Sequence, residues 1–203
     1  AYHYQLLEQY EAAALTAEYV FRQFPDSAQA PAMARLAVNC YLNAMSALRK
    51  AQKLPPEEVA ADSRRVKAIG RALEEKFPTD PATDPVRHNL AFLFSVEKNY
   101  PEALRLYEAI QPSYADLPRA RLEEGSAMYS LLRSQVSDQA KTQQQVVDGI
   151  QAGIKKPEVS PLWVRTLADL TAVPAPPVNA AVETLQDYLK VKSQLAQLYQ
   201  LEG

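Results

Sequence analysis

The amino-acid sequence predicts a fold built only of α-helices. Apolar residues recur at intervals of three and four along most of its 203 residues, which is the period of a helix that buries one face. No segment shows sustained two-residue alternation of apolar and polar residues, and no Asn-Gly turn marks a β-hairpin. The chain has only five glycines, too few for the tight turns that connect many short strands.

Three long helices are predicted in the first part of the chain. The first spans about residues 6–24 and stops at FPDSAQAP, where proline and small polar residues break the pattern. The second spans about residues 31–48 and starts at Pro31, because proline lacks the N–H donor that a first helical turn leaves unused. The third spans about residues 56–77, starts in the same way at Pro56 and ends before FPTDPATDP.

The second part of the chain predicts further helices with a less regular pattern. Residues 87–110 have the pattern of two short helices, and another helix spans about residues 117–132. A polar stretch after Ser137 precedes a last pair of helices. Within that stretch Gly149 and Gly153 are four residues apart, which predicts close packing of their helix against a neighbour.

The chain is therefore expected to have three parts. Residues 1–172 form a helical array, and residues 173–179 form a proline-rich connector, because prolines remove N–H donors and disfavour helix in the residues before them. Residues 180–203 carry an amphipathic helix that caps the array or docks on another chain. Asn179 is suited to cap the start of this helix.

The segment RHNLAFLFSVEKNYPEALRLYEAI, residues 87–110, resembles one tetratricopeptide repeat. That family places Trp, Leu, Gly and an aromatic residue on its first helix, then Ala and an aromatic residue on its second. The corresponding residues here are Arg87, Leu90, Ala91, Phe94, Ala103 and Tyr107. In such a pair, a small residue lets the two helices approach closely and aromatic residues fill the space between them. Ala91 and Phe94 can serve these roles although the Trp is missing. The resemblance implies a right-handed α-solenoid of antiparallel helix pairs.

A second match to the same repeat is partial. Ala91 and Gly125 are thirty-four residues apart (125 − 91), which is the length of one such repeat. Gly125 supplies the small residue that the pattern requires. Arg121 and Glu124, however, stand where the pattern has Trp and Leu. The repeats are therefore expected to be degenerate.

The early helices depart from that spacing. Two helix stops, at Phe24 and Phe77, resemble each other but are fifty-three residues apart (77 − 24), which indicates longer helices or an irregular array. The stretch FPDSAQAPAMARLA, residues 24–37, also resembles repeats in bacterial cell-envelope accessory proteins. Because the sequence opens on Ala1 rather than Met, we expect a fragment of a longer protein.

The resemblance implies a binding surface on the concave side of the array. In such repeats, the positions just after the Trp and just after the Gly face a groove that holds a partner segment. Applied to residues 87–110, to the thirty-four-residue shift and to the two helix stops, this rule selects Arg35, Asn39, His88, Phe92, Leu122 and Ser126. The alternative is that these are only exposed helix positions, because a degenerate repeat fixes the register to about one residue.

No motif for catalysis or cofactor binding is present. The chain lacks HExxH, CxxC, GxSxG, a Walker-type glycine loop and a calcium loop. His3 and His88 lie far apart in the sequence, and Cys40 lies on the apolar stripe of its helix, where a buried thiol packs as a small hydrophobic residue. We therefore expect no catalytic residue, no metal site and no cofactor.

Charge and hydropathy limit the classes of partner. Twenty-two basic and twenty-four acidic residues leave a net charge of −2, which gives no long-range attraction toward nucleic acid or an anionic membrane. No run approaches the roughly 18 apolar residues of a membrane span, and the N-terminus has no signal-peptide pattern. We expect a soluble protein of the cytoplasm or periplasm that neither binds nucleic acid nor inserts into a membrane.

The sequence thus favours a non-catalytic scaffold that binds a protein or peptide partner. One alternative is a structural or oligomerisation segment of a larger protein, and another is a helical enzyme without a recognisable motif. The inner surface distinguishes the first two, since a polar, well-formed groove favours a binder and a flat apolar patch of several hundred Å² favours assembly. A deep pocket with converging carboxylates would favour the enzyme.

Overall fold

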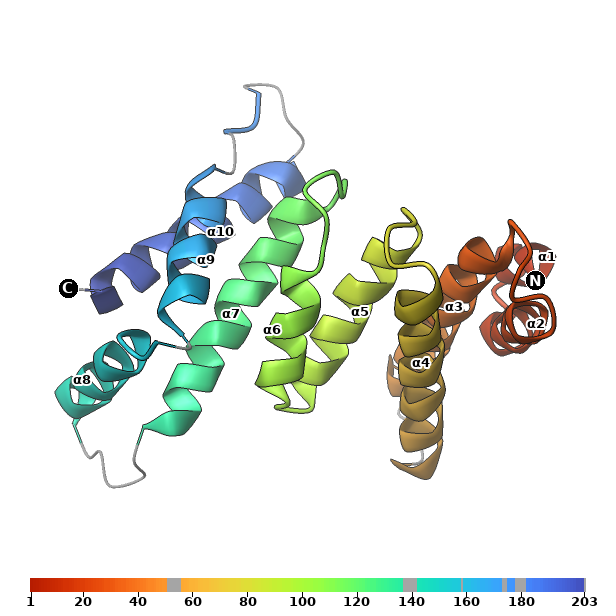
Figure 1. The fold of residues 1–203 in the computed structure, drawn as a ribbon, viewed down its shortest axis with the longest axis horizontal. Coiled ribbons are helices and arrows are strands. Elements are labelled where there is room, and N and C mark those ends of the chain that lie inside the picture. Colours follow the sequence, from red (N-terminus) through yellow and green to blue (C-terminus); the bar gives the residue numbers. More distant parts are fainter. Residues whose placement is uncertain (51–55, 137–141, 158, 173–174, 178–181, 203) are drawn as a thin grey trace. The chain divides into compact units, whose positions relative to one another are not determined.

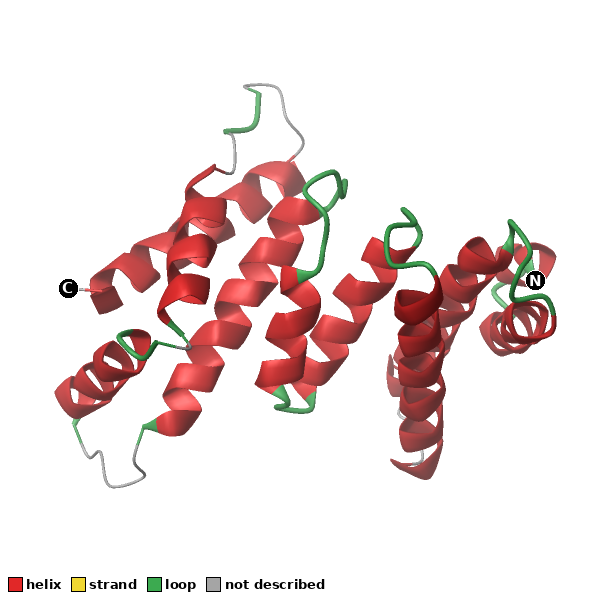
Figure 2. Cartoon of the chain, in the orientation of Figure 1, coloured by secondary structure: helices red, strands yellow, loops and turns green. Residues whose placement is uncertain are grey.

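The computed structural model describes residues 1–50, 56–136, 142–157, 159–172, 175–177 and 182–202 (Figure 1). Its helices are α1 (Tyr2–Leu6), α2 (Tyr10–Gln23), α3 (Ala30–Lys50), α4 (Pro56–Lys76), α5 (Thr83–Val96), α6 (Tyr100–Glu108), α7 (Leu117–Gln135), α8 (Gln143–Ile154), α9 (Ser160–Ala172) and α10 (Val182–Glu202). Figure 2 shows every described element as a helix, which confirms the predicted all-α class. The right-handed solenoid of antiparallel pairs stays a prediction.

Most predicted helices are confirmed with shifted ends. The predicted segments 31–48, 56–77 and 117–132 are α3, α4 and α7, and residues 87–110 contain the predicted pair as α5 and α6. Residues 175–177 of the predicted connector are not helical. The predicted cap Asn179 lies outside the described residues.

The chain forms two compact units. The first unit holds residues 1–93 and 109–114, and the second holds residues 94–108 and 115–203. The boundary falls inside the predicted array, and α10 contacts α7, α8 and α9 of the second unit.

The core of the first unit lies where α2 packs against α3. Ala13 and Ala17 of α2 and Ala37 of α3 are completely buried. Small side chains at a helix contact allow the two axes to lie close together. Tyr41 of α3 is also completely buried, and its hydroxyl donates a hydrogen bond to Oε2 of Glu18 on α2 at 2.6 Å.

The prediction of one helix over residues 6–24 was wrong, because the chain turns between α1 and α2. Glu8 has a positive φ of 56°, its N–H bonds the carbonyl of Gln5 at 3.0 Å, and the N–H of Gln9 bonds the carbonyl of Tyr4 at 2.9 Å. These two bonds close the end of α1 in a Schellman-type turn, and Tyr10 then begins α2. The apolar pattern hid this turn, since apolar residues lie on both sides of it and no glycine marks the left-handed position.

The same turn recurs between α5 and α6. Lys98 has a φ of 62°, its N–H bonds the carbonyl of Ser95 at 3.0 Å, and the N–H of Asn99 bonds the carbonyl of Phe94 at 2.9 Å. Tyr100 then begins α6, as Tyr10 begins α2. Two helix pairs of the chain are therefore joined by the same three-residue device.

Close helix contact is visible at Gly70 of α4. A Cβ atom at this position would lie 2.2 Å from Cδ1 of Leu90 and 3.3 Å from Cγ1 of Val86, both on α5. The absent side chain thus lets α5 press its buried leucine against the backbone of α4. The predicted close packing at Gly153 of α8 is confirmed, because a Cβ there would lie 2.8 Å from Cδ2 of Leu132 on α7.

The second unit is arranged around α7, which contacts α6, α8, α9 and α10. Met128 and Leu132 of α7 are buried, as are Trp163 and Leu170 of α9 and Leu198 of α10. This core leaves the opposite side of α7 available to line a surface.

Candidate functional site

A groove lies between α7 and α10 in the second unit. It has a volume of about 700 Å³. Its lining residues come from one face of each helix: Ser126, Tyr129 and Ser130 from α7, and Gln186, Leu189, Ser193, Gln197 and Leu198 from α10. The spacing of three and four residues within each set is that of a single helix face. We call this feature the α7–α10 groove.

The α7–α10 groove combines apolar area with uncharged polar groups. Leu198 is buried beneath it, whereas Tyr129 is 40% exposed and Leu189 is 64% exposed. The other lining residues are serines and glutamines, and none of the eight carries a charge at neutral pH. The hydroxyl of Ser130 donates to the carbonyl of Ser126 at 2.8 Å. A hydroxyl that donates retains its lone pairs as acceptors, so this wall can accept a hydrogen bond from an incoming N–H.

The buried face of α7 is held by a charged cluster on the side away from the groove. Glu124 is completely buried, and its Oε2 accepts from Nη1 of Arg121 at 2.9 Å. Its Oε1 accepts from Nη2 of Arg165 on α9, whose Nη1 lies 2.8 Å from Oε1 of Glu108 on α6. Ser126 lies roughly 200° around the helix from Glu124 at 100° per residue. The cluster therefore fixes the rotation of α7 and with it the face that lines the groove.

Burial raises the pKa of Glu124, and the guanidinium groups of Arg121 and Arg165 oppose this shift. The two effects have opposite sign because burial disfavours the charged carboxylate while a nearby cation favours it. Nη1 of Arg121 also donates to the carbonyl oxygen of Tyr107 at 2.8 Å, which ties α7 to the end of α6. Arg121 and Glu124 are buried, whereas Arg165 is partly exposed and Glu108 is exposed, so the cluster links α6, α7 and α9 from the core to the surface.

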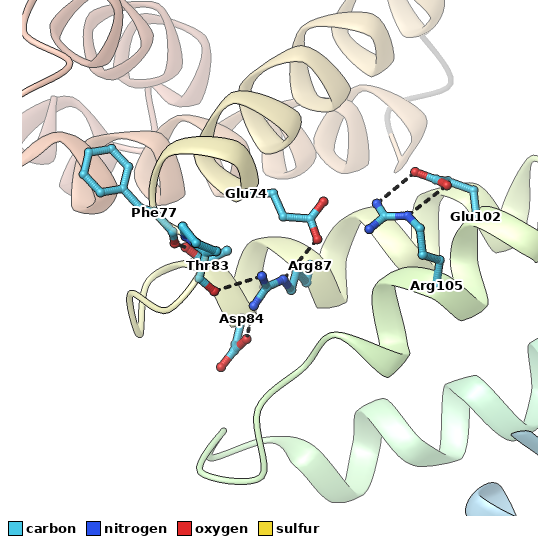
Figure 3. Close-up of polar contacts among 8 residues, drawn as sticks. Glu74, Phe77, Thr83, Asp84, Arg87, Glu102 and Arg105 are labelled. Atoms are coloured by element: carbon cyan, nitrogen blue, oxygen red, sulfur yellow. Dashed lines mark hydrogen bonds and ion pairs between the residues drawn. The ribbon is translucent and has the colours of Figure 1, made fainter.

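A second charged cluster joins α4 to α5 in the first unit (Figure 3). Arg87 is buried and donates through Nη1 to Oδ1 of Asp84 at 2.9 Å and through Nε to Oε1 of Glu74 at 3.2 Å. Its Nη2 donates to the carbonyl oxygen of Pro78 at 2.9 Å. The sequence pattern showed Arg87 only as a missing Trp. A carboxylate three residues before it was the available signal for this link.

Three of the predicted partner-binding residues in the first unit lie on α3 and on the first turns of α5. Arg35 is exposed, whereas Asn39 is half-buried and its Oδ1 accepts from Nδ2 of Asn89 at 3.0 Å. His88 is buried, and its Nδ1 lies 3.1 Å from the hydroxyl of Tyr114, with the two rings edge to face. His88 and Asn39 therefore contact their own unit.

The remaining predicted residues are Phe92, Leu122 and Ser126. Phe92, also in the first unit, is 53% exposed. On α7 of the second unit, Leu122 is half-buried and Ser126, one turn later, is exposed and lines the α7–α10 groove. The structure thus places one of the six residues in a groove. Sequence reasoning missed the α10 wall, because the pairing of α7 with α10 depends on contacts between residues far apart in the chain.

Comparison with protein-family models, with curated proteins and with solved structures found no match. The resemblance of residues 87–110 to a tetratricopeptide repeat stays a prediction.

The part of the chain that the structure describes contains no group of three or more His, Cys, Asp or Glu side chains placed to hold a metal ion. None of its helices is long and apolar enough to cross a membrane. Cys40 is buried as predicted, and burial raises the pKa of its thiol.

Proposed function

We propose that this protein is a non-catalytic interaction scaffold that binds a segment of a protein partner in the α7–α10 groove. The observation that supports the proposal is a groove of about 700 Å³ between two helices, lined by exposed apolar side chains and uncharged hydrogen-bonding groups. Peptide recognition needs both kinds of group, since apolar contacts supply affinity and polar groups set the register of the bound segment. Of the residues predicted from the sequence, Ser126 belongs to the α7 wall in this proposal.

The lining predicts the chemistry of the bound segment. Tyr129 and Leu189 offer apolar area from opposite walls, so the segment should carry an apolar or aromatic anchor between them. Gln186, Ser130 and Gln197 can bond the polar groups of the segment. Because the lining carries no charge, binding should depend weakly on salt concentration.

Selection of peptides on the full chain tests the proposal. Random peptides displayed on phage are selected against the wild-type protein, and the affinities of the selected peptides are measured for two variants. Leu189→Asp places a charge in the groove, and Val164→Asp places one at a comparably exposed residue of α9, 59% exposed, that does not line it. We expect at least a tenfold loss of affinity for Leu189→Asp and none for Val164→Asp. Equal binding of all peptides by both variants would overturn the proposal.

A second candidate function is assembly, and a different surface favours it. Exposed apolar residues are concentrated on α1 and α2 of the first unit, including Leu6 and Tyr19. An exposed apolar surface of this kind often marks a contact between proteins. The two functions are compatible if this surface itself supplies the bound segment.

A further inference from the structure

The first 24 residues carry an unusual share of exposed apolar area. Among the described residues, seven of the fourteen exposed large hydrophobic side chains lie there. They are Tyr2, Tyr4, Leu6, Leu7, Leu15, Tyr19 and Phe24. Helix α1 itself buries no residue, and Leu6 is 82% exposed. A helix of five residues gains little from its own hydrogen bonds, so the surface of α1 is suited to packing on something further.

The surface of α1 matches the chemistry of the α7–α10 groove. Residues 1–7, AYHYQLL, contain no Asp, Glu, Lys or Arg, and the groove lining contains none either. Burying the one surface in the other would therefore strip water from no Asp, Glu, Lys or Arg side chain, and burying such a charge without a partner is costly. The hydroxyls of Tyr2 and Tyr4 need hydrogen-bond partners when buried, and the serines and glutamines of the groove provide them.

The length of α1 also fits the length of the groove wall formed by α10. At 1.5 Å per residue, α1 is roughly 8 Å long, and the α10 wall from Gln186 to Gln197 is roughly 16 Å long. The wall therefore accommodates α1 together with Leu7. Leu6 and Leu7 would then supply the apolar anchor that Tyr129 and Leu189 are placed to contact.

We propose that the segment bound in the α7–α10 groove is residues 2–7 of a second copy of this chain. This inference rests on the proposed function, and it names the partner. The donor surface lies on the first unit and the acceptor groove on the second, so the contact joins two different surfaces in a head-to-tail manner. Such an interface is small, and the association should be weak and reversible.

Sedimentation of the full chain over a range of concentrations tests the proposal. The wild type should associate as its concentration rises. Leu6→Asp damages the donor surface and Leu189→Asp damages the groove, so each variant alone should stay monomeric. An equimolar mixture should form a one-to-one dimer and nothing larger, because one variant keeps an intact groove and the other an intact α1. Val164→Asp serves as the control and should associate like the wild type.

Further outcomes decide against the proposal. A monomeric wild type at all concentrations would overturn it, as would a mixture that stays monomeric or an association unchanged by either substitution. Association lost in Leu6→Asp but kept in Leu189→Asp would show that α1 docks elsewhere. Ser193→Arg is a second substitution in the groove, at an exposed residue, and it should also be monomeric. It controls for any effect of Leu189→Asp on folding.

A peptide experiment separates the failure of this inference from the failure of the proposed function. A fluorescent peptide of residues 1–9, AYHYQLLEQ, is titrated with full-length Leu6→Asp, whose groove is intact. We expect binding that Leu189→Asp reduces at least tenfold. If this peptide does not bind while peptides selected by display bind and are lost in Leu189→Asp, the second-copy inference is wrong and the proposed function stands. If neither kind of peptide binds, both are wrong.

Discussion

Arg87 and Arg121, thirty-four residues apart (121 − 87), share three features in their separate units. Each is buried, each bonds a carboxylate three residues away on its own helix, and each donates to a backbone carbonyl oxygen of the preceding segment. The carboxylates are Asp84 and Glu124. A buried cation is tolerated only when its charge and its N–H groups are satisfied. Both arginines therefore link consecutive helices.

Replacing Arg87 should destabilise the protein strongly. Arg87→Met leaves the carboxylate of Asp84 buried without its cation, which typically costs about 3–5 kcal/mol. Arg105→Met is the control, because Arg105 pairs with Glu102 at 3.0 Å in a partly exposed ion pair (Figure 3). Losing such a pair should cost about 0–1 kcal/mol. Urea unfolding monitored by circular dichroism measures the loss of unfolding free energy in both variants. Equal losses would contradict the role of Arg87 in linking α4 to α5.

The contribution of Glu124 to stability should fall as pH rises. Its pKa is raised above the usual glutamate value of 4.5, chiefly by burial. A group with a raised folded-state pKa stabilises the fold fully below its unfolded pKa, and this stabilisation is lost as pH rises through the folded pKa. The free energy of unfolding of the wild type should therefore exceed that of Glu124→Gln most at low pH. The difference should shrink as the pH rises above 4.5. Parallel unfolding free energies of the two proteins from pH 4.5 to neutral pH would contradict the raised pKa.

Gly70→Ala should destabilise the first unit although alanine favours helix. Alanine gains about 1 kcal/mol in helix propensity, but its Cβ would meet Cδ1 of the buried Leu90 at 2.2 Å. Overpacking a core costs about 1–3 kcal/mol, so we expect a net loss. Gly149→Ala is the comparison, since its Cβ would lie 3.0 Å from the nearest atom of Val136 and the strain is smaller. A higher melting temperature for Gly70→Ala would show that Leu90 moves aside without cost.

Ser126 should contribute to binding through its place on the groove wall. Ser126→Arg introduces a long charged side chain into an uncharged groove and should weaken peptides selected on the wild type at least tenfold. Ser134→Arg makes the same change at another exposed serine of α7 that does not line the groove. Fluorescence anisotropy with labelled peptides compares the two, and equal affinities would remove Ser126 from the site.

Phe92 tests the predicted surface of the first unit. It is 53% exposed, so Phe92→Ala should leave the melting temperature within a few degrees of the wild type while reducing recovery of any partner that binds this face. His88 is less suitable for such a test, because it is buried against Tyr114 and its replacement would also change folding. Unchanged recovery of every partner by Phe92→Ala would leave the α7–α10 groove as the candidate surface.

Several features of this protein could be determined from the sequence by itself. The three- and four-residue period and the proline stops located α3, α4 and α7 to within a few residues, because helix formation and termination depend on neighbours along the chain. The buried Cys40 followed from the same period. Where a turn used ordinary residues in a left-handed conformation, as at Glu8, the local pattern contained no signal.

Only the tertiary structure decided which faces meet. Leu189 lies in the amphipathic helix predicted over residues 180–203, yet it is 64% exposed and lines a groove, because α10 packs through Leu195 and Leu198 instead. Arg87 and Arg121 stood where an aromatic residue was expected, and their roles depend on carboxylates and carbonyls brought together by folding. Periodicity records what lies on one side of a helix, whereas contacts between distant helices determine what that side faces.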